Sequence, residues 1–396
     1  MKKIVKILIL CLSCIGACWL LPACSSAIEE PESGGGGDGS TVTLKLNAMV
    51  PGYETRARGN EFSPEVEKID NLRIFVVDKK TKEVVYNSNF TNPFQDRDDE
   101  FQVTIDVEKN TTQVVYFLAN AEEYCKNLPN SGETYTDLDT PDDLYNLVLT
   151  DIPDPRSNLS TRANSSSERI PYTSRYEIEI GEKDVVEETC YIAIAAVKFD
   201  IVFNNKTADE LTVSSLQINS IADQFYLFPH LKDESTWNDW INSAISSGEN
   251  KKYITEYSIP EGTDHDDFLV PIGQPTDDEP SEISSFKIAE DNGSYTIPTF
   301  YCYESKNDPF SELGNDQHYI IQFQIGDQPF FSEIKTEENH LASLIRSTHV
   351  KITVNINSLG QSDPDIIISG EIVDWGWVDE VTGDIEEVEG YPEPHN

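Results

Sequence analysis

Apolar and polar residues alternate along many short stretches of this chain. Val42, Leu44, Leu46, Ala48 and Val50 follow a period of two, and the same period recurs at 101–107 and 176–180. Because successive side chains of a strand point to opposite faces of a sheet, this period predicts half-buried β-strands. Turn residues separate nearly all of these stretches. The chain is therefore expected to fold as an all-β protein.

Other segments are apolar without interruption, which is typical of strands buried on both faces. Residues 74–77 and 114–118 have this character. Further strands are predicted at 198–203, 211–218, 299–303, 319–325, 350–356 and 366–373. Helix is expected to be the minority, with the best candidate at 236–245, where Trp237 and Trp240 share one face. Their helical spacing favours packing onto a sheet over a sugar-binding platform.

The first 23 residues have the character of a secretion signal, with Lys2, Lys3 and Lys6 before a long apolar run. Leu21-Pro22-Ala23-Cys24 resembles a lipobox. In proteins with this motif the signal is removed before the cysteine, which then carries acyl chains. Two or more acyl chains hold a protein stably on a bilayer, so Cys24 is predicted to be a lipid anchor. An ordinary signal peptide with a chance cysteine is the alternative.

The remaining chain divides by composition. Residues 24–40 are rich in glycine, serine and glutamate, which predicts a flexible tether. The segment that follows has more residues than a domain with a single hydrophobic core usually contains. Two domains are therefore expected, at 41–188 and 189–379. Residues 380–396 form an acidic tail that contains two prolines, and we expect it to be disordered.

The charge balance restricts the partners. The chain has 71 acidic and 29 basic residues, for a net charge of −42. This excludes nucleic acid and any anionic partner that is attracted electrostatically. The acidic run at 96–100 lacks the ligand spacing of an EF-hand, so no metal site is assigned and calcium binding is left open.

Three cysteines remain beyond Cys24, at Cys125, Cys190 and Cys302. Their odd number and wide spacing argue against a disulfide framework. We expect buried thiols that act as small hydrophobic side chains, and the pairing of any two of them is left open.

The sequence has no G-x-S-x-G elbow, no H-E-x-x-H, no P-loop and no Cys/His cluster of the metal-binding type. Its six histidines occur singly. The chain is therefore predicted not to be an enzyme, and no cofactor is expected.

Four segments resemble motifs of a known family. They are 66–76 (VEKIDNLRIFV), 195–199 (AAVKF), 301–304 (YCYE) and 345–354 (IRSTHVKITV). Together with the lipobox and the tether, they make the chain similar to the fimbrillins, the major and minor fimbrial subunits of the Bacteroidales. Ser305 and Ser347 depart from the family pattern, in which an Asn is common at each place.

The resemblance implies two tandem transthyretin-like Greek-key β-sandwich domains and assembly by strand exchange. In the family, a trypsin-like, arginine-specific protease cuts after the first strand, which here is 41–50. Arg56-Ala57 is the best match for the cut, and Arg58-Gly59 is the alternative. The connector at 51–63 has no apolar pattern, as expected of an exposed, cleavable segment.

Loss of the first strand would leave an open groove that another chain's strand can fill. The candidate donor is the C-terminal region, where Ile366, Ile368 and Ile372 alternate and Trp375 and Trp377 follow as large anchors. An ordinary last strand of the second domain is the alternative.

The predicted function is a structural subunit of a cell-surface fimbrium, at its shaft or tip, that serves adhesion. Its partners would be other fimbrial subunits, the processing protease and, through Cys24, the outer membrane; the mature subunit would lie in the extracellular fimbrium. One alternative is an uncleaved outer-membrane anchor subunit. Another is a monomeric glycan-binding surface lipoprotein that uses Trp237, Trp240, Tyr301 and Tyr303. The sequence identifies no receptor.

Overall fold

The computed structural model describes residues 40–50, 67–94, 100–135, 141–150, 169–230, 258–270, 272, 285–306, 319–334, 343–359 and 365–374. The predicted helix at 236–245 and the connector at 51–63 lie outside these residues. So do Cys24, Arg56, Ala57, Arg58, Gly59, Trp375 and Trp377.

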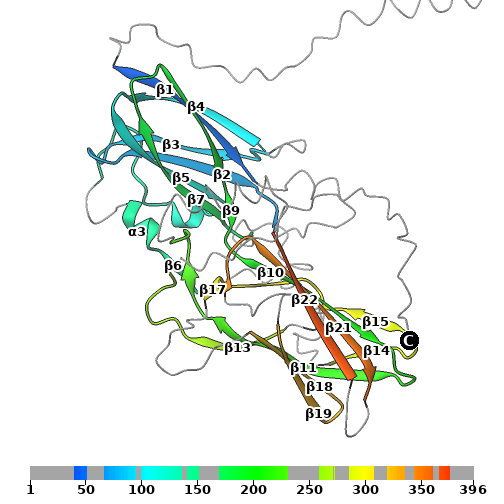
Figure 1. Cartoon of the computed structure of the whole chain (residues 1–396). Coiled ribbons are helices and arrows are strands. Elements are labelled where there is room, and N and C mark those ends of the chain that lie inside the picture. Colours follow the sequence, from blue (N-terminus) through cyan, green and yellow to red (C-terminus); the bar gives the residue numbers. More distant parts are fainter. Residues whose placement is uncertain are drawn as a thin grey trace, which may run out of the picture. The chain divides into compact units, whose positions relative to one another are not determined.

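The described part of the chain consists mainly of β-strands, as the alternating pattern predicted (Figure 1). Its helices are a short α-helix, α3 (Pro141–Tyr145), and one 3₁₀ turn, η3 (Glu122–Tyr124). The strands are β1 (Thr41–Met49), β2 (Asn71–Asp78), β3 (Val84–Thr91), β4 (Glu100–Glu108), β5 (Thr111–Ala119), β6 (Val148–Leu149), β7 (Tyr172–Ile180), β8 (Val185–Tyr191), β9 (Ala193–Ile194), β10 (Val197–Asn205), β11 (Leu211–Ala222), β12 (Phe225–Tyr226), β13 (His265–Leu269), β14 (Ser285–Ile288), β15 (Gly293–Thr296), β16 (Phe300–Cys302), β17 (Ser305–Lys306), β18 (Ile320–Ile325), β19 (Gln328–Glu333), β20 (Ser343–Leu344), β21 (Thr348–Ser358) and β22 (Asp365–Asp374).

A first sandwich-like body is built from two sheets. One has the strand order β4-β1-β8, and the other has the order β3-β2-β5-β7-β9. The core between them contains the inward side chains of β1, such as Leu44 and Leu46, and those of β2 and β5, such as Ile74 and Phe117. The alternating pattern of β1 arises because only one of its faces meets this core.

The second sheet of this body is covered on both faces. Phe75, Val77, Val114 and Tyr116 point away from the first core and pack in another apolar cluster with Phe228. This explains why residues 74–77 of β2 and 114–118 of β5 are apolar without interruption, and the prediction that both faces of these runs are buried is confirmed.

A second sandwich-like body follows. Its sheets have the orders β15-β10-β21-β22, with β16 also paired to β10, and β13-β11-β18-β19, with β14 also paired to β11. Phe199, Phe203 and Phe323 lie in the core between them. The predicted two-body, all-β architecture is thus confirmed. The boundary near residue 188 stays a prediction, since β8 pairs with β1 and β9 with β7, and the second body's strands begin at β10.

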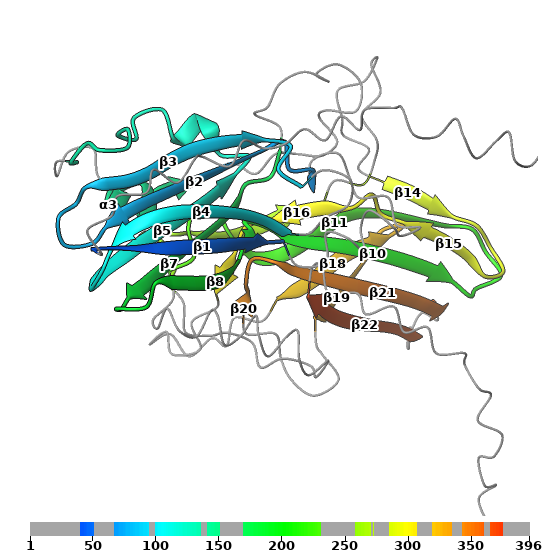
Figure 2. The same ribbon diagram turned by 90° about the horizontal axis from the view of Figure 1, so that it is seen from above.

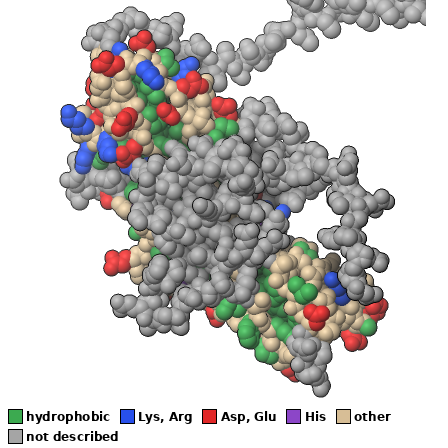
Figure 3. Space-filling model, in the orientation of Figure 1, with side chains coloured by type: hydrophobic (Ala, Val, Ile, Leu, Met, Phe, Trp, Pro, Cys, Tyr) green, Lys and Arg blue, Asp and Glu red, His purple; other side chains and the backbone are tan. Residues whose placement is uncertain are grey.

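The surface contains acidic side chains among polar and apolar ones, as Figure 3 shows for the described residues of one face. Within the described residues, no helix is long and apolar enough to span a membrane. Cys125, Cys190 and Cys302 are buried free thiols, so the prediction that they act as small core residues is confirmed.

We predict that Leu46→Ala lowers the free energy of unfolding by about 2–5 kcal/mol, because the removed side chain leaves a cavity in a packed core. Leu46 is fully buried on β1, whereas Lys45 lies on the opposite face of the same strand. Lys45→Ala is the matched control and should change stability by no more than about 0.5 kcal/mol. Urea titration of both variants measures the difference, and equal midpoints would contradict the placement of β1.

Candidate functional site

Strand β1 is paired along both of its edges (Figure 2). It runs antiparallel to β4, from Thr41 opposite Glu108 to Met49 opposite Glu100. It runs parallel to β8, from Thr43 opposite Val185 to Met49 opposite Tyr191. In the described chain β4 and β8 are neighbours only through β1, so removing β1 would expose a backbone edge on each of them.

The inward face of β1 supplies a large share of the first core. Val42, Leu44, Leu46, Ala48 and Val50 are at most 1% exposed. Their burial stabilises the body by roughly 1.5–3 kcal/mol for each large side chain. Any strand that replaced β1 would have to supply comparable apolar side chains at these places.

The outward face of β1 has one nearly buried polar residue. Asn47 accepts a hydrogen bond from Gln102 of β4 (2.7 Å) and donates one to Glu187 of β8 (3.2 Å). This amide therefore links all three strands of the sheet and ties β1 to one position along its neighbours.

The predicted donor strand, β22, lies at the edge of a sheet in the second body. It pairs with β21, in a register that places Ile368 opposite Val354 and Ile366 opposite Ile356. Ile366 and Ile368 are partly buried against the second core, while Ile367 on the other face is 55% exposed. Among residues 365–369 of β22, exposed and partly buried side chains alternate, and Ile366 and Ile368 are less buried than Leu44 and Leu46 of β1.

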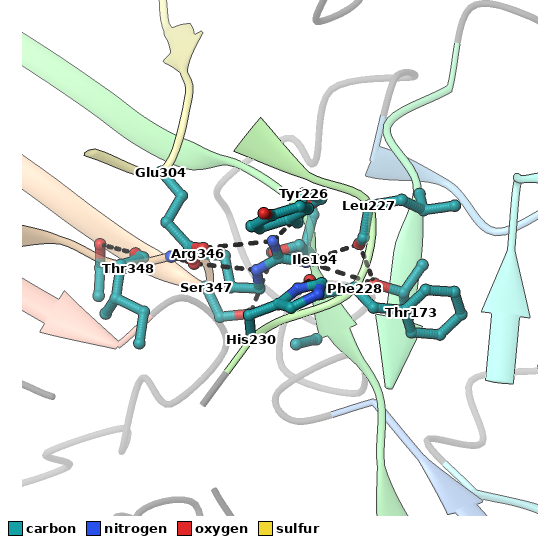
Figure 4. Close-up of polar contacts among 12 residues, drawn as sticks. Thr173, Ile194, Tyr226, Leu227, Phe228, His230, Glu304, Arg346, Ser347 and Thr348 are labelled. Carbon is teal, nitrogen blue, oxygen red and sulfur yellow. Dashed lines mark hydrogen bonds and ion pairs between the residues drawn. The ribbon is translucent and has the colours of Figure 1, made fainter. Parts of the chain in front are cut away.

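A buried ion pair lies between two segments next to strands of the second body, and its arginine also contacts β7 of the first body (Figure 4). Arg346, between β20 and β21, is 0% exposed, and Glu304, between β16 and β17, is 2% exposed. The Arg346 guanidinium donates to Glu304 Oε2 at 2.9 Å and to Oε1 at 3.3 Å. It also donates to the backbone oxygens of Leu227 (2.7 Å) and Tyr226 (2.6 Å), and more weakly to Thr173 of β7 (3.4 Å). A charge is tolerated at this depth because both ions are paired and hydrogen-bonded.

A second buried polar cluster centres on Glu67, the first described residue after the connector. Its carboxylate accepts a hydrogen bond from Tyr301 at 2.6 Å and pairs with Lys198 at 3.2 Å. Its backbone oxygen accepts a hydrogen bond from Tyr172 at 2.7 Å. Burial, together with the nearby Glu67 charge, raises the pKa of Tyr301 well above its usual range, so the phenol stays a donor. These contacts hold Glu67 against β7, β10 and β16.

Asp200 of β10 forms a further polar contact, with His349 at 2.7 Å and Thr299 at 2.6 Å. Burial by itself would raise the pKa of this carboxyl, but the hydrogen bonds from His349 and Thr299 outweigh it and lower the pKa to about 2. Asp200 therefore stays ionised in the folded protein and helps to hold β10 against β21.

Ser305 and Ser347, the two serines that stand where an Asn is common in the family, both fit their surroundings in the structure. The buried Ser305 hydroxyl accepts a hydrogen bond from the Ala222 N–H and donates one to the Ser220 carbonyl. Ser347 has a φ of 62°, in the left-handed region where Asn is the more favourable residue. The left-handed backbone conformation at this position therefore favours an Asn, and Ser347 adopts the same conformation.

The structure also corrects one expectation. Tyr301 was expected as a sugar-stacking surface in the glycan-binding alternative, but it is buried at 5% exposure and bonded to Glu67. Tyr303 packs on Phe225, and its hydroxyl donates to the Thr150 carbonyl. Trp237 and Trp240 lie outside the described residues. No group of His, Cys, Asp and Glu within the described ranges could hold a metal ion.

The sequence analysis missed the charged residues of the junction formed by Arg346, Glu304, Glu67 and Lys198. Each lies inside a segment that was noted for its resemblance: 345–354, 301–304, 66–76 and 195–199 respectively. Two of these segments, 195–199 and 301–304, contain a single charge among apolar residues. Such a charge is costly to bury alone, so Lys198 and Glu304 were each a signal of a buried partner.

We predict that Arg346→Met lowers the free energy of unfolding by about 3–5 kcal/mol, because Glu304 would be left as an unpaired buried charge. Arg73→Met is the matched control: Arg73 pairs with Glu122 near the surface, with side chains 18% and 33% exposed. Its loss should cost no more than about 1 kcal/mol. The double variant Arg346→Met/Glu304→Leu should recover part of the loss. Chemical denaturation measures all three, and a neutral Arg346→Met would refute the role of the pair.

Residues 40–168 match the family model described as "Major fimbrial subunit protein (FimA)". No curated protein sequence matches the chain. Among solved structures, the chain is similar to the tip fimbrial protein Mfa3 from Porphyromonas gingivalis with C-terminal truncation, at 13% identity and a TM-score of 0.45, over 85% of this chain and 100% of that one. A fimbrial assembly protein from Parabacteroides distasonis is similar at 13% identity and a TM-score of 0.41, over 84% and 98%. The fimbrial anchor protein Mfa2 from Porphyromonas gingivalis is similar at 10% identity and a TM-score of 0.38, over 84% and 98%. The similarity to this family of major fimbrial subunit proteins thus covers residues 40–168, about a third of the chain.

Proposed function

We propose that this chain is a structural subunit of a cell-surface fimbrium, made as a lipoprotein precursor and assembled by donor-strand insertion. In this proposal Cys24 carries the lipid that holds the precursor on the outer membrane. A trypsin-like protease cuts at Arg56-Ala57, or at Arg58-Gly59, and so releases the lipid together with β1. Strand β22 of another copy, with Ile366, Ile368 and Ile372, then fills the vacated place, and Trp375 and Trp377 anchor it beyond the strand.

The observation that carries this proposal is the position of β1. It is the middle strand of its sheet, and it contributes four core residues, with Val50 directly after it as a fifth. The predicted cut separates all five from the rest of the chain. A replacement strand with about five apolar side chains would gain on the order of 7–15 kcal/mol before entropy is counted. That gain is sufficient for nearly irreversible polymerisation.

The C-terminal strand suits the role of donor because it lies at a sheet edge and has one pairing partner among the described strands, β21. Release of an edge strand breaks one ladder of backbone hydrogen bonds, whereas insertion between β4 and β8 forms two. Exchange from the edge of the second body to the middle of the first is therefore favourable.

The junction around Arg346 and Glu67 supports the same role. In a fibre held together by inserted strands, tension passes through every subunit from its groove to its donor strand. Buried charges that hydrogen-bond across elements of both bodies resist separation more than an apolar contact that can slide. A shaft or tip subunit would need this resistance.

Two alternatives lead to different outcomes. An uncleaved anchor subunit would keep β1 and its lipid and would resist cutting at Arg56 and Arg58. A monomeric glycan-binding lipoprotein would bind sugar without assembling, and the burial of Tyr301 removes one of its four proposed stacking residues.

The proposal is tested by limited trypsin digestion of the chain from Ser25 onward in the presence of a maleimide reagent. Cys190 is 1% exposed and lies opposite Ala48 on β1, and burial raises the pKa of its thiol. We expect an early cut after Arg56 or Arg58, followed by labelling of Cys190 as β1 leaves, and in the absence of the reagent a ladder of multimers on native electrophoresis.

Cys302 is the internal control, because it lies in the second core and should stay unlabelled after the cut. Arg56→Ala/Arg58→Ala is the matched variant, which should resist the cut and leave Cys190 unlabelled. A chain that is cut, keeps Cys190 protected and stays monomeric would argue against donor-strand assembly. Resistance of the wild-type chain would favour the anchor.

A further inference from the structure

The space that the inward side chains of β1 fill differs in size from one position along the strand to the next. Along its inward face the residues at 42, 44 and 46 are large, the residue at 48 is alanine, and Val50 follows. Ala48 lies opposite Phe101 of β4, whose ring packs on Phe90 (centroids 4.7 Å apart) and on Phe94 (6.5 Å). A large aromatic side chain thus fills the volume beside Ala48, and a second large side chain there would overpack the core.

Every second residue of β22, from Ile366 to Ile372, follows a matching order of sizes in the sequence. Its register with β21 places this row opposite four buried residues: Ile366 opposite Ile356, Ile368 opposite Val354, Gly370 opposite Ile352 and Ile372 opposite Val350. The row therefore reads large, large, small, large, and Gly370 is its small member.

We propose that β22 of one copy enters the groove of the next in a single register, in which Gly370 takes the place of Ala48. This inference rests on the proposed function. In the same chain direction as β1, the register puts Ile366 in the place of Leu44, Ile368 in the place of Leu46 and Ile372 in the place of Val50. A shift by two residues in either direction brings an isoleucine to Ala48 and leaves a cavity where the glycine then falls.

The outward face selects the same register. With Gly370 at Ala48, Ser369 takes the place of Asn47, between Gln102 and Glu187. A serine hydroxyl can accept a hydrogen bond from the Gln102 amide and donate one to the Glu187 carboxylate, as Asn47 does. The two shifted registers bring Glu371 or Ile367 to this place. Glu371 would place a second carboxylate beside Glu187. Ile367 has no polar side chain, so Gln102 and Glu187 would each lose the hydrogen bond that Asn47 makes with them.

The register has one unfavourable feature. It brings Asp365 opposite Asp106 and Glu371 opposite Glu100, which are like-charge pairs near the two ends of the strand. Asp106 and Glu100 are exposed, so water and salt screen these pairs, and assembly should become faster as the salt concentration rises.

Disulfide trapping tests the register directly. Residues directly opposite on antiparallel strands have Cα atoms about 4.5–5.5 Å apart, within the disulfide range of about 4.4–6.8 Å. We would prepare Ser369→Cys/Gln102→Cys for the proposed register. Ser369→Cys/Thr104→Cys and Ser369→Cys/Glu100→Cys are the matched variants for the two shifted registers, because Thr104 pairs with Lys45 and Glu100 with Met49.

Each variant is cut with trypsin, allowed to assemble and oxidised mildly, then run on native gels and on non-reducing denaturing gels. The expected result is a reducible ladder of covalent multimers for Ser369→Cys/Gln102→Cys, and monomers on denaturing gels for the other two. The single variant Ser369→Cys controls for cross-links to the native cysteines.

The other outcomes separate this inference from the proposed function. A ladder from the Thr104 or Glu100 variant overturns the register and leaves donor-strand assembly standing. Multimers on native gels with no covalent ladder in any variant overturn the assignment of β22 in this register. Absence of multimers on native gels for the wild-type chain overturns the proposed function, and this inference with it.

A size test at Gly370 gives an independent readout. Gly370→Ala should assemble like the wild type, because alanine already fits at Ala48. Gly370→Leu should reduce the yield of multimers by on the order of tenfold, because extra methylenes in a packed core are destabilising. Circular dichroism of the uncut chains shows whether both variants fold. Equal assembly of two folded variants would overturn the inference.

Discussion

The first sandwich-like body depends on backbone pairing through one strand. Among the described strands, β4 and β8 share a sheet only through β1, which hydrogen-bonds to both of them. The same strand fills the core with side chains that are almost completely shielded from water. The strand that comes first in the sheet-forming part of the chain is therefore the one whose loss would open the body most. The connector that contains the predicted cleavage sites follows β1 directly in the sequence, so the predicted cut would separate this strand from the rest of the chain.

The junction around Arg346 has the opposite character. Its ions lie on loops and strands far apart in the sequence: Glu304 and Arg346 are buried together, and Glu67 pairs with Lys198. Arg346 also donates to the backbone carbonyls of Leu227 and Tyr226, and Glu67 also accepts a hydrogen bond from the Tyr301 hydroxyl. Such clusters are expensive to form and strongly destabilising to break, so they set one arrangement of the elements they join. The molecule thus combines β1, the strand that we propose is replaced, with buried ion pairs that resist rearrangement.

Much of the fold followed from periodicity alone. The period of two in 42–50 and 101–107 predicted β1 and β4, and the unbroken apolar runs predicted that β2 and β5 are buried on both faces. Periodicity gives the buried face of a strand but not its neighbour, so the parallel pairing of β1 with β8 could not be read from it. The partnership of Arg346 with Glu304 was equally hidden, because a charge in an apolar segment indicates that a partner exists without identifying it. Tyr301 was misassigned for a related reason: an aromatic residue suits a sugar platform or a core equally well until its neighbours are known.

The central claim is that the place between β4 and β8 accepts a strand from outside the chain. Hydrogen–deuterium exchange of the chain after removal of β1 tests it most directly, with a synthetic peptide of residues 365–374 added and with a Gly370→Leu peptide as the control. The account predicts that amides of β4 and β8 exchange rapidly without peptide and are protected by the natural sequence, and only weakly by the control. Protection of β4 and β8 in the absence of any peptide, or equal protection by both peptides, would contradict it.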